Sequence, residues 1–270
     1  AAARAPRRTA DRVAAAARAV SDAVDAGLRV SPATQLNRPI GPHRRVEWLA
    51  LELAQVKDVK NRLGGTVNDV VLATVAGALH RFLGGRGELR ARLDYRIVIP
   101  VNLRPPGDTS ARGNSVSARF LSLPIADASP LRRHRSIRSA TERTKEARAA
   151  EGIQLLTRLA DGAVAAMPLL RFGGSLISWL RPYNLIVTNV PGPQMPLFML
   201  GARLHELLPM LPLFDAQGLG VAALSYCGRL GVGLIADREL APDLATLREA
   251  FEASFEELCD AARSRRHTAA

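Results

Sequence analysis

The chain has 270 residues, of which 47% are hydrophobic and only 4% aromatic, and its formal net charge is +12. This is enough apolar material for one large domain or two small ones, and no apolar run reaches the roughly 18 residues that a membrane-spanning helix needs. The charge suits an anionic partner such as nucleic acid, a membrane surface or a phosphate-bearing molecule, but the scarcity of aromatic residues disfavours nucleic acid.

Residues 1–30 are rich in Ala and Arg and predict a basic, weakly amphipathic linker helix. The chain begins with Ala, so we expect it to be a fragment or a processed piece. The remaining residues, 31–270, are predicted to form the main domain. Near its start, the stretch Asn37–Arg44 is too rigid and too polar for a flexible linker, and we expect it to be ordered against the core.

A buried helix over Gly64–Leu83 is the element around which the chain is organised. Thr66 is a good N-cap, and Asp69, three residues later, completes a variant of the capping box. A helix that is apolar nearly all round belongs in a core. Asn68 is a polar residue in its first turn, which we expect to be buried, so its amide either ties the helix to a neighbour or faces a site.

The remaining elements follow from apolar periodicity and turn residues. Strands are predicted over Val46–Leu53, Tyr95–Arg104, Val116–Leu123, Leu185–Val190, Gly220–Tyr226 and Arg229–Ile235, with short strands and turns over Met195–Leu213. Helices are predicted over Ala54–Leu63, Pro130–Ala150, Ile153–Met167, Leu169–Leu180 and from Pro242 to about Arg263. The irregular alternation predicts an α/β or α+β fold with a mixed sheet flanked by helices.

The residues alone indicate no complete catalytic constellation. The five histidines are isolated, and His134 stands among arginines, which predicts a solvated position. His80 is interpreted as a helix-end residue rather than a base. Cys227 and Cys259 lack metal-ligand spacing, so no metal site is predicted, and we expect both to be reduced core residues of an intracellular protein.

Several short motifs occur in an order that is more specific than any one of them. They are Leu36–Gly41, Thr66–Ala73, Pro100–Arg104, Gly113–Asn114, Thr188–Pro193 and Leu224–Gly228. This ordered set resembles the C-terminal half of the bacterial wax ester synthase/diacylglycerol acyltransferase family. The resemblance covers roughly Ser31 to Leu258.

The resemblance implies one half of a CoA-dependent, chloramphenicol-acetyltransferase-like fold, with a tunnel between two similar halves. Acyl-CoA enters from one side and the acceptor, diacylglycerol or a long-chain alcohol, from the other, and no cofactor is permanently bound. The general base of the family is the second His of an HHxxxDG motif in the N-terminal half. This chain lacks that motif, so the resemblance implies that it does not catalyse alone and that the other half is its partner.

The resemblance also implies roles for particular residues. Asn68 and Asp69 match the family's Asn-Asp motif, which shapes the site. Thr188 and Asn189 match its Ser-Asn-Val-Pro-Gly-Pro motif, with Thr in place of Ser, and a hydroxyl at that place stabilises the oxyanion in related folds. The alternative is that they form a strand end held by the Pro-Gly-Pro turn. Arg104 and Asn114, in two further motifs, are the expected contacts to CoA.

Three functions remain open at this point. The first is the C-terminal half of an acyl-CoA:alcohol O-acyltransferase, and the second is a non-catalytic module that binds acyl-CoA, lipid or a partner domain. The third, supported by charge alone, is nucleic-acid binding, and we expect no nucleic acid as a partner. We expect a cytoplasmic protein, at most peripheral on the inner membrane or on lipid inclusions. The apolar content of Ile153–Leu180 and Met195–Leu213 predicts an exposed apolar face where the missing half docks.

Overall fold

The structure is a computed structural model that describes residues 30–102, 116–146 and 183–264. The chain divides into two compact units, and nearly all described residues belong to the unit formed by Ser31–Pro100, Arg119–Ala147 and Tyr183–Ala270. Some predictions fall outside the described residues. These are the linker helix in residues 1–30, the helices over Ile153–Met167 and Leu169–Leu180, and the positions of Arg104 and Asn114.

A six-stranded mixed sheet forms the centre of this unit. Its strand order is β1-β8-β7-β4-β2-β3, in which β4 is parallel to β2 and β7, whereas β8 is antiparallel to β7 and β1. The bounds are Arg44–Glu52 for β1, Tyr95–Asn102 for β2, Val116–Leu123 for β3, Leu185–Val190 for β4, Leu219–Tyr226 for β7 and Arg229–Asp237 for β8. Each strand predicted from the sequence is present, so the expected mixed sheet is confirmed.

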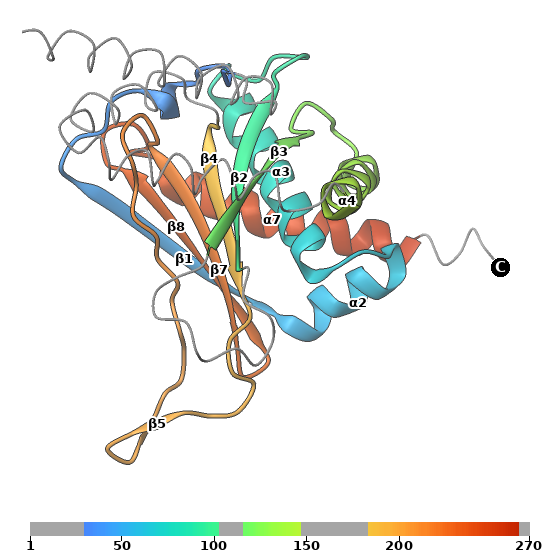
Figure 1. Ribbon diagram of the computed structural model, residues 1–270, viewed down its shortest axis with the longest axis vertical. Helices are drawn as coiled ribbons and strands as arrows, with labels where there is room; N and C mark the ends of the chain where they lie inside the picture. Colours follow the sequence, from blue (N-terminus) through green and yellow to red (C-terminus); the bar gives the residue numbers. More distant parts are fainter. Residues whose placement is uncertain (1–29, 103–115, 147–182, 265–270) are drawn as a thin grey trace, which may run out of the picture. The chain divides into compact units, whose positions relative to one another are not determined.

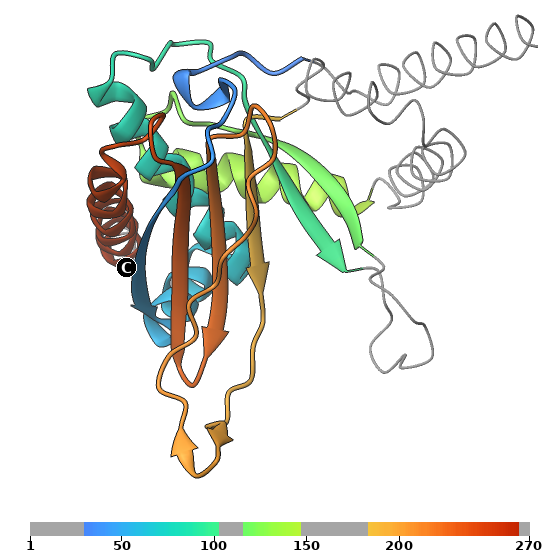
Figure 2. The same ribbon diagram turned by 90° about the vertical axis from the view of Figure 1, so that its left-hand side faces the viewer.

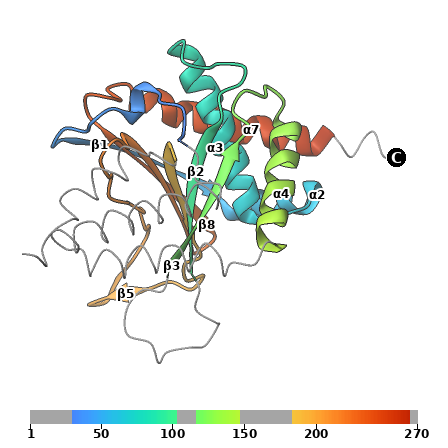
Figure 3. The same cartoon turned by 45° about the horizontal axis from the view of Figure 1, so that its top comes forward.

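The four α-helices of the described residues lie on one side of this sheet (Figures 1 and 3). They are α2 (Leu53–Leu63), α3 (Val67–Gly85), α4 (Pro130–Glu146) and α7 (Leu244–Ser264). The apolar stripe of α7 is buried throughout, at Leu244, Leu247, Phe251, Phe255 and Leu258. Glu47 of β1 reaches toward this layer, because its carboxylate lies 3.7 Å from the guanidinium of Arg248 on α7. Glu47 therefore marks the helix-covered face.

The core helix α3 begins as the sequence predicts. Thr66 Oγ1 accepts a hydrogen bond from the backbone N–H of Asp69 (3.2 Å), and the Asp69 carboxylate accepts one from the backbone N–H of Thr66 (2.7 Å). Both halves of the capping box are thus formed. The box provides hydrogen-bond partners for backbone N–H groups that the start of a helix leaves free. Gly64 and Gly65 separate the end of α2 from this start.

Residues 191–218, between β4 and β7, leave the sheet and return along the face opposite the helices (Figure 2). They carry a small hairpin of β5 (Phe198–Met199) and β6 (Ala202–Arg203), as the predicted short strands and turns imply. Leu200 and Gly201 connect them with φ values of +50° and +83°, as in a type I′ turn. We call residues 197–203 the tip and residues 204–214 the strap.

The 3-10 helix η2 (Gln35–Asn37) confirms that the Pro-rich start of the domain is ordered against the core. The amide of Asn37 is buried and donates to the carbonyl oxygens of Asn184 (3.0 Å) and Ala216 (3.2 Å). Asn184 returns a hydrogen bond from Nδ2 to Asn37 Oδ1 (2.8 Å). This amide pair joins the start of the domain to the beginning of β4.

Three expectations about burial are wrong. His134 is buried rather than solvated, as is its neighbour Arg133, because this side of α4 packs against α3 and α7. The Arg133 guanidinium donates to the Asp127 and Ala128 carbonyl oxygens and to the Glu257 carboxylate, each at 2.9 Å. These bonds compensate for the burial of the charge.

The other two corrections concern Cys227 and Asn68. Cys227 is half-buried in the turn between β7 and β8, with φ +43°, whereas Cys259 is a core residue as predicted. Asn68 is half-buried because α4 covers the first turn of α3 on the side of Asp69 and leaves the side of Asn68 more open.

Candidate active site

The four predicted site residues that the structure describes, Asn68, Asp69, Thr188 and Asn189, lie at one end of the unit. The parallel strands β2, β4 and β7 all run toward the end of the sheet at which α3 begins (Figures 1 and 2). Ligands of open α/β sheets bind outside the carboxyl ends of such strands. Thr188 and Asn189 are the last two residues of β4 before Val190, and Asn68 and Asp69 lie in the first turn of α3. This end of the sheet is therefore the candidate site.

Thr188 lies on the face of the sheet that carries the strap. It is level with Ala222 of β7, Gly233 of β8 and Trp48 of β1, which share one face because they are register partners. A Cβ atom on Gly233 would lie only 1.9 Å from the carbonyl oxygen of Pro209 in the strap. We call this side, opposite the helices, the open face.

Asn189 points to the opposite side. In register, Asn189 is opposite Ala223 of β7, which is opposite Val232 of β8, which is opposite Leu49 of β1. Leu49 is two residues from Glu47, whose carboxylate pairs with Arg248 of α7. Side chains two residues apart on a strand share a face. Asn189 therefore faces the helix layer, and the structure separates it from Thr188 although the two are adjacent in sequence.

Asp69 is fully engaged within the chain. Its Oδ2 accepts hydrogen bonds from the backbone N–H (2.7 Å) and the hydroxyl (2.8 Å) of Thr66, and its Oδ1 accepts one from the hydroxyl of Thr141 on α4 (2.7 Å). The carboxylate thus caps α3 and ties it to α4. Its geometry suits a residue that positions the start of α3.

Asn68, beside it, is half-buried, and within the described part of the chain its amide makes no hydrogen bond. Of the four predicted residues, Asn68, Asp69 and Asn189 belong to the helix side of the sheet, and Thr188 alone lies on the open face. Thr188 therefore differs from the other three in the face of the sheet to which its side chain belongs.

The Pro191–Pro193 turn after β4 is held by two residues that sequence reasoning did not single out as site residues. Ser225 Oγ accepts a hydrogen bond from the N–H of Gly192 (3.1 Å), and Gln194 bridges the Gly192 carbonyl, the Ser225 hydroxyl and the N–H of Gly228. A Cβ on Gly192 would lie 2.2 Å from the Ser225 carbonyl oxygen. The glycine between two prolines was the available signal for this close approach.

Titratable groups give no further candidate in the described ranges. Burial raises the pKa values of Tyr95, Tyr183 and the Cys259 thiol, so these groups stay protonated at neutral pH. His80 lies five residues before the end of α3, and its Nδ1 is 2.7 Å from the Ile125 carbonyl oxygen. Within residues 30–102, 116–146 and 183–264, no group of three His, Cys, Asp or Glu side chains could hold a metal ion.

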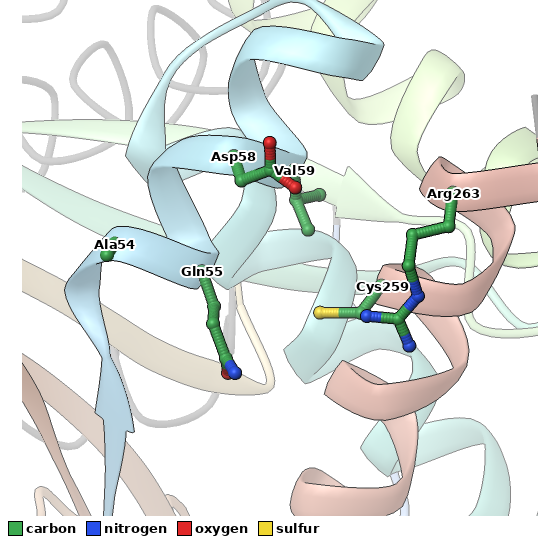
Figure 4. A pocket seen from close by; sticks show the side chains of 6 residues that line it. All are labelled: Ala54, Gln55, Asp58, Val59, Cys259 and Arg263. Atoms are coloured by element: carbon green, nitrogen blue, oxygen red, sulfur yellow. The ribbon is translucent and has the colours of Figure 1, made fainter. Parts of the chain in front are cut away.

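A depression of about 270 Å³ lies between α2 and α7 (Figure 4). It is lined by Ala54, Gln55, Asp58, Val59, Cys259 and Arg263. The Cys259 thiol points into it, and burial raises the pKa of this thiol although the nearby Arg263 opposes the shift. The depression belongs to the helix layer, and none of the predicted site residues lines it.

Solved structures share this fold over most of the chain. A wax ester synthase/diacylglycerol acyltransferase from Marinobacter aquaeolei VT8 matches 93% of this chain and 57% of its own, with a TM-score of 0.69 and 24% identity. The first condensation domain of the calcium-dependent antibiotic synthetase matches 97% of this chain and 56% of its own, with a TM-score of 0.54 and 21% identity. The fold is one half of the chloramphenicol-acetyltransferase-like architecture predicted from the motifs.

Family models give the more specific assignment. Residues 112–259 match the WS/DGAT C-terminal domain, and residues 1–71 match the wax ester synthase/diacylglycerol acyltransferase catalytic domain. The chain therefore belongs to the wax ester synthase/diacylglycerol acyltransferase family, which confirms the resemblance carried by the motifs. The predicted division at residue 30 stays a prediction.

Relatives in Mycobacterium tuberculosis are similar over most of this chain. One, provisionally named a diacylglycerol O-acyltransferase, is 34% identical over 85% of this chain and 46% of its own length. Another, the probable diacylglycerol O-acyltransferase tgs1, is 31% identical over 91% of this chain and 53% of its own. The chain thus spans about half the length of these relatives. In the described residues, no helix is both long enough and apolar enough to cross a membrane.

Proposed function

We propose that this chain is the C-terminal half of an acyl-CoA:alcohol O-acyltransferase that forms triacylglycerol or wax ester. Family membership and the names of the relatives support this activity. The observation that carries the proposal is the hydroxyl of Thr188, which stands on the open face near the carboxyl end of β4. A hydroxyl on the open face can contact a substrate, whereas a hydroxyl on the other face would contact the helix layer.

The proposed reaction is a transfer of an acyl group from sulfur to oxygen. The second His of the HHxxxDG motif in the other half takes the proton of the acceptor hydroxyl, and the oxygen attacks the thioester carbonyl carbon. The tetrahedral intermediate collapses with cleavage of the carbon–sulfur bond. The CoA thiolate leaves and takes up the proton, so the products are an ester and free CoA.

This chain would stabilise the intermediate rather than start the reaction. In the proposal, the Thr188 hydroxyl donates a hydrogen bond to the oxyanion as its charge develops. Asn68, Asp69 and Asn189 act as supporting residues from the helix side, with Asp69 holding the start of α3 in place. Arg104 and Asn114 are the proposed contacts to CoA, which is a substrate and not a resident cofactor.

The other half of the enzyme is the proposed partner on the open face. Of the described residues, eleven large hydrophobic side chains are exposed, and eight of them belong to residues 195–214. Trp48 and Val190, also exposed, lie on the same face by their register. Concentrated exposed apolar residues mark interaction surfaces. The relatives extend well beyond the part that this chain matches, which supports the proposal of a second half.

We further propose a cytoplasmic enzyme that works at a lipid surface, either the inner membrane or lipid inclusions. Its acceptor, diacylglycerol or a long-chain alcohol, is dissolved in lipid, so the complete enzyme must reach a lipid phase to collect it. Peripheral attachment would follow from apolar residues and from arginines that meet anionic headgroups.

Coexpression of this chain with an HHxxxDG half tests the proposal. The pair should form ester from acyl-CoA and diacylglycerol, while the chain alone should match a heat-killed control. Thr188→Val should lower kcat on the order of 10²–10³-fold, as loss of one oxyanion donor does, and Thr188→Ser should keep most activity. Ester formation by the chain alone, or full activity of Thr188→Val, would contradict it. If the pair binds acyl-CoA but forms no ester, the result would favour the alternative that this chain is a non-catalytic binding module.

A further inference from the structure

The strap is fixed to the domain at both ends. At one end, Tyr226 Oη accepts a hydrogen bond from the N–H of Leu197 (2.8 Å) and donates one to the carbonyl oxygen of Leu204 (2.9 Å). At the other end, the N–H of Gly218 donates to the carbonyl oxygen of Leu36 (2.7 Å). Between these clamps, within the described chain, no hydrogen bond joins residues 207–213 to the sheet.

Three glycines of the sheet lie beneath the middle of the strap. A Cβ on Gly233 would be 1.9 Å from the Pro209 carbonyl oxygen, and one on Gly231 would be 2.7 Å from the Leu207 carbonyl oxygen. A Cβ on Gly220 would be 2.4 Å from Leu211 Cδ1. The strap backbone therefore rests directly on sheet backbone at Gly231 and Gly233, and any side chain there would push it away. We call these three glycines the track.

Because the strap lies on the track as an extended segment, its side chains alternate between facing the sheet and facing outward. From Leu207 to Phe214 the strap alternates between half-buried and exposed side chains, as an extended segment on a flat surface does. The outward side carries Leu208 (37% exposed), Met210 (64%) and Phe214 (54%). These three form an apolar row that stands above the open face.

The row lies close to the candidate site. Pro209 contacts the sheet at Gly233, which is level with Thr188 and separated from it by β7. Two strand spacings correspond to about 10 Å. The height of the strap over Gly233 therefore sets the position of the apolar row relative to the Thr188 hydroxyl.

We propose that Gly231 and Gly233 are positioning residues that hold the strap flush with the sheet, so that its apolar row forms the wall against which the hydrocarbon chain of a substrate lies. The claim that the apolar row contacts a hydrocarbon chain rests on the proposed function. The placement of the strap by the glycines does not, so the two are tested separately.

The first test uses this chain alone and measures the strap. Gly233→Ala and Gly231→Ala should increase the rate of chymotryptic cleavage within residues 204–214 by about tenfold or more, while thermal unfolding changes by only a few degrees. Gly220→Ala should have a smaller effect, because Leu211 can change rotamer whereas a backbone carbonyl has no such freedom. Gly85→Ala is the matched control, since nothing lies within 4 Å of its added Cβ.

Unchanged cleavage in Gly233→Ala and Gly231→Ala would overturn the inference. So would collapse of the whole circular dichroism spectrum in both variants, because the glycines would then serve the core and not the strap.

The second test uses the two-half enzyme. Gly233→Ala should raise KM for long-chain acyl-CoA and lower its kcat/KM on the order of 10²-fold, as an ångström-scale misplacement can, with kcat for a short-chain substrate nearly unchanged. An equal loss for all chain lengths would overturn the role of the row. If the pair proves inactive, the proposed function fails, and the cleavage test still decides whether the glycines hold the strap.

Discussion

Asn68 and Asp69 are neighbours in sequence, but their side chains have different surroundings. Asp69 is buried and accepts hydrogen bonds from Thr66 and Thr141, whereas Asn68 is half-exposed. We predict that Asp69→Asn lowers the free energy of unfolding by about 1–3 kcal/mol, because an amide nitrogen would face donors that the carboxylate now accepts. Asn68→Ala should change it by only about 0.5 kcal/mol. Thermal unfolding of the chain measures both.

The order of the two variants should reverse when kcat per folded molecule is measured in the two-half enzyme: the variant that is nearly as stable as the parent should lose more activity. Asn68→Ala should lose most of its kcat if the amide orients reacting groups, whereas Asp69→Asn should lose activity mainly through a smaller folded fraction. A rate within about threefold of the parent for Asn68→Ala would assign Asn68 a structural role.

At the scale of single residues, the sequence predicts which residues are candidates for the site better than it predicts what surrounds them. Alternation along β4 already implies that Thr188 and Asn189 face opposite sides, but the open side is defined by the strap and by α7. The burial of Arg133 depends on Glu257, 124 residues further along the chain. A polar, Arg-rich helix gives no local signal that one of its arginines enters the core.

At the scale of elements, Gly77 allows the close approach of α3 and α7. A Cβ there would lie 2.0 Å from Ser254 Oγ and 2.8 Å from Arg133 Nη2. Alanine normally favours a helix over glycine by about 1 kcal/mol, but overpacking costs about 1–3 kcal/mol. We therefore predict that Gly77→Ala lowers the stability measured by denaturant unfolding, while Gly85→Ala in the same helix leaves it equal or higher.

Ser254 provides the control for this contact. Its hydroxyl is buried and makes no hydrogen bond, so Ser254→Ala should be neutral or stabilising. In the double variant it should restore part of the stability lost by Gly77→Ala, because it removes the nearest clashing atom. Simple addition of the two single effects would show that the clash is not at Ser254.

Asp237, at the end of β8, joins the start of β1 and the loop before it to the turn that follows β8. Burial alone would raise its pKa, but hydrogen bonds from the N–H groups of Leu240, Gly41 and Glu239, together with nearby Arg44, bring the pKa below its ordinary value of 3.8. A depressed folded-state pKa contributes stability above the unfolded value, and this stability is lost as the pH falls through the folded-state pKa.

Asp237→Asn should therefore be less stable than the parent at pH 7, and the difference should shrink below about pH 4 as the parent carboxylate is protonated. Melting temperatures of the two proteins between pH 7 and pH 2.5 provide the measurement. A difference that stays constant over this range would show that the ionised form has no special role.

The elements themselves were largely predictable, for local reasons. The start of α3 follows from its capping box and the face of α7 from its apolar stripe. The strap was not predictable as a layer on the sheet, because it has no regular structure. Its position depends on glycines in strands that follow it in the sequence.

At the scale of the whole molecule, most exposed large apolar residues of the described ranges belong to residues 195–214, which leave the sheet between β4 and β7. Leu200, at the turn of the tip, is fully exposed and has a positive φ, which a β-branched or bulky residue adopts only at a cost. In the proposed function, this tip is the surface that the HHxxxDG half would cover. The family assignment was predictable from ordered motifs, and so was an exposed apolar face that includes residues 195–213. The structure was needed to place that face along the strap and the tip.

The last prediction concerns docking through the tip. The double variant Met199→Ser, Leu200→Ser should abolish copurification of this chain with a tagged HHxxxDG half, because it removes two exposed apolar side chains. Its melting temperature should stay within a few degrees of the parent, since neither side chain is packed in the core. Val30→Ser, which changes an exposed apolar residue outside the tip, is the control and should copurify normally. If the tip instead inserts into lipid, the variant would copurify as the parent does and lose binding to anionic vesicles.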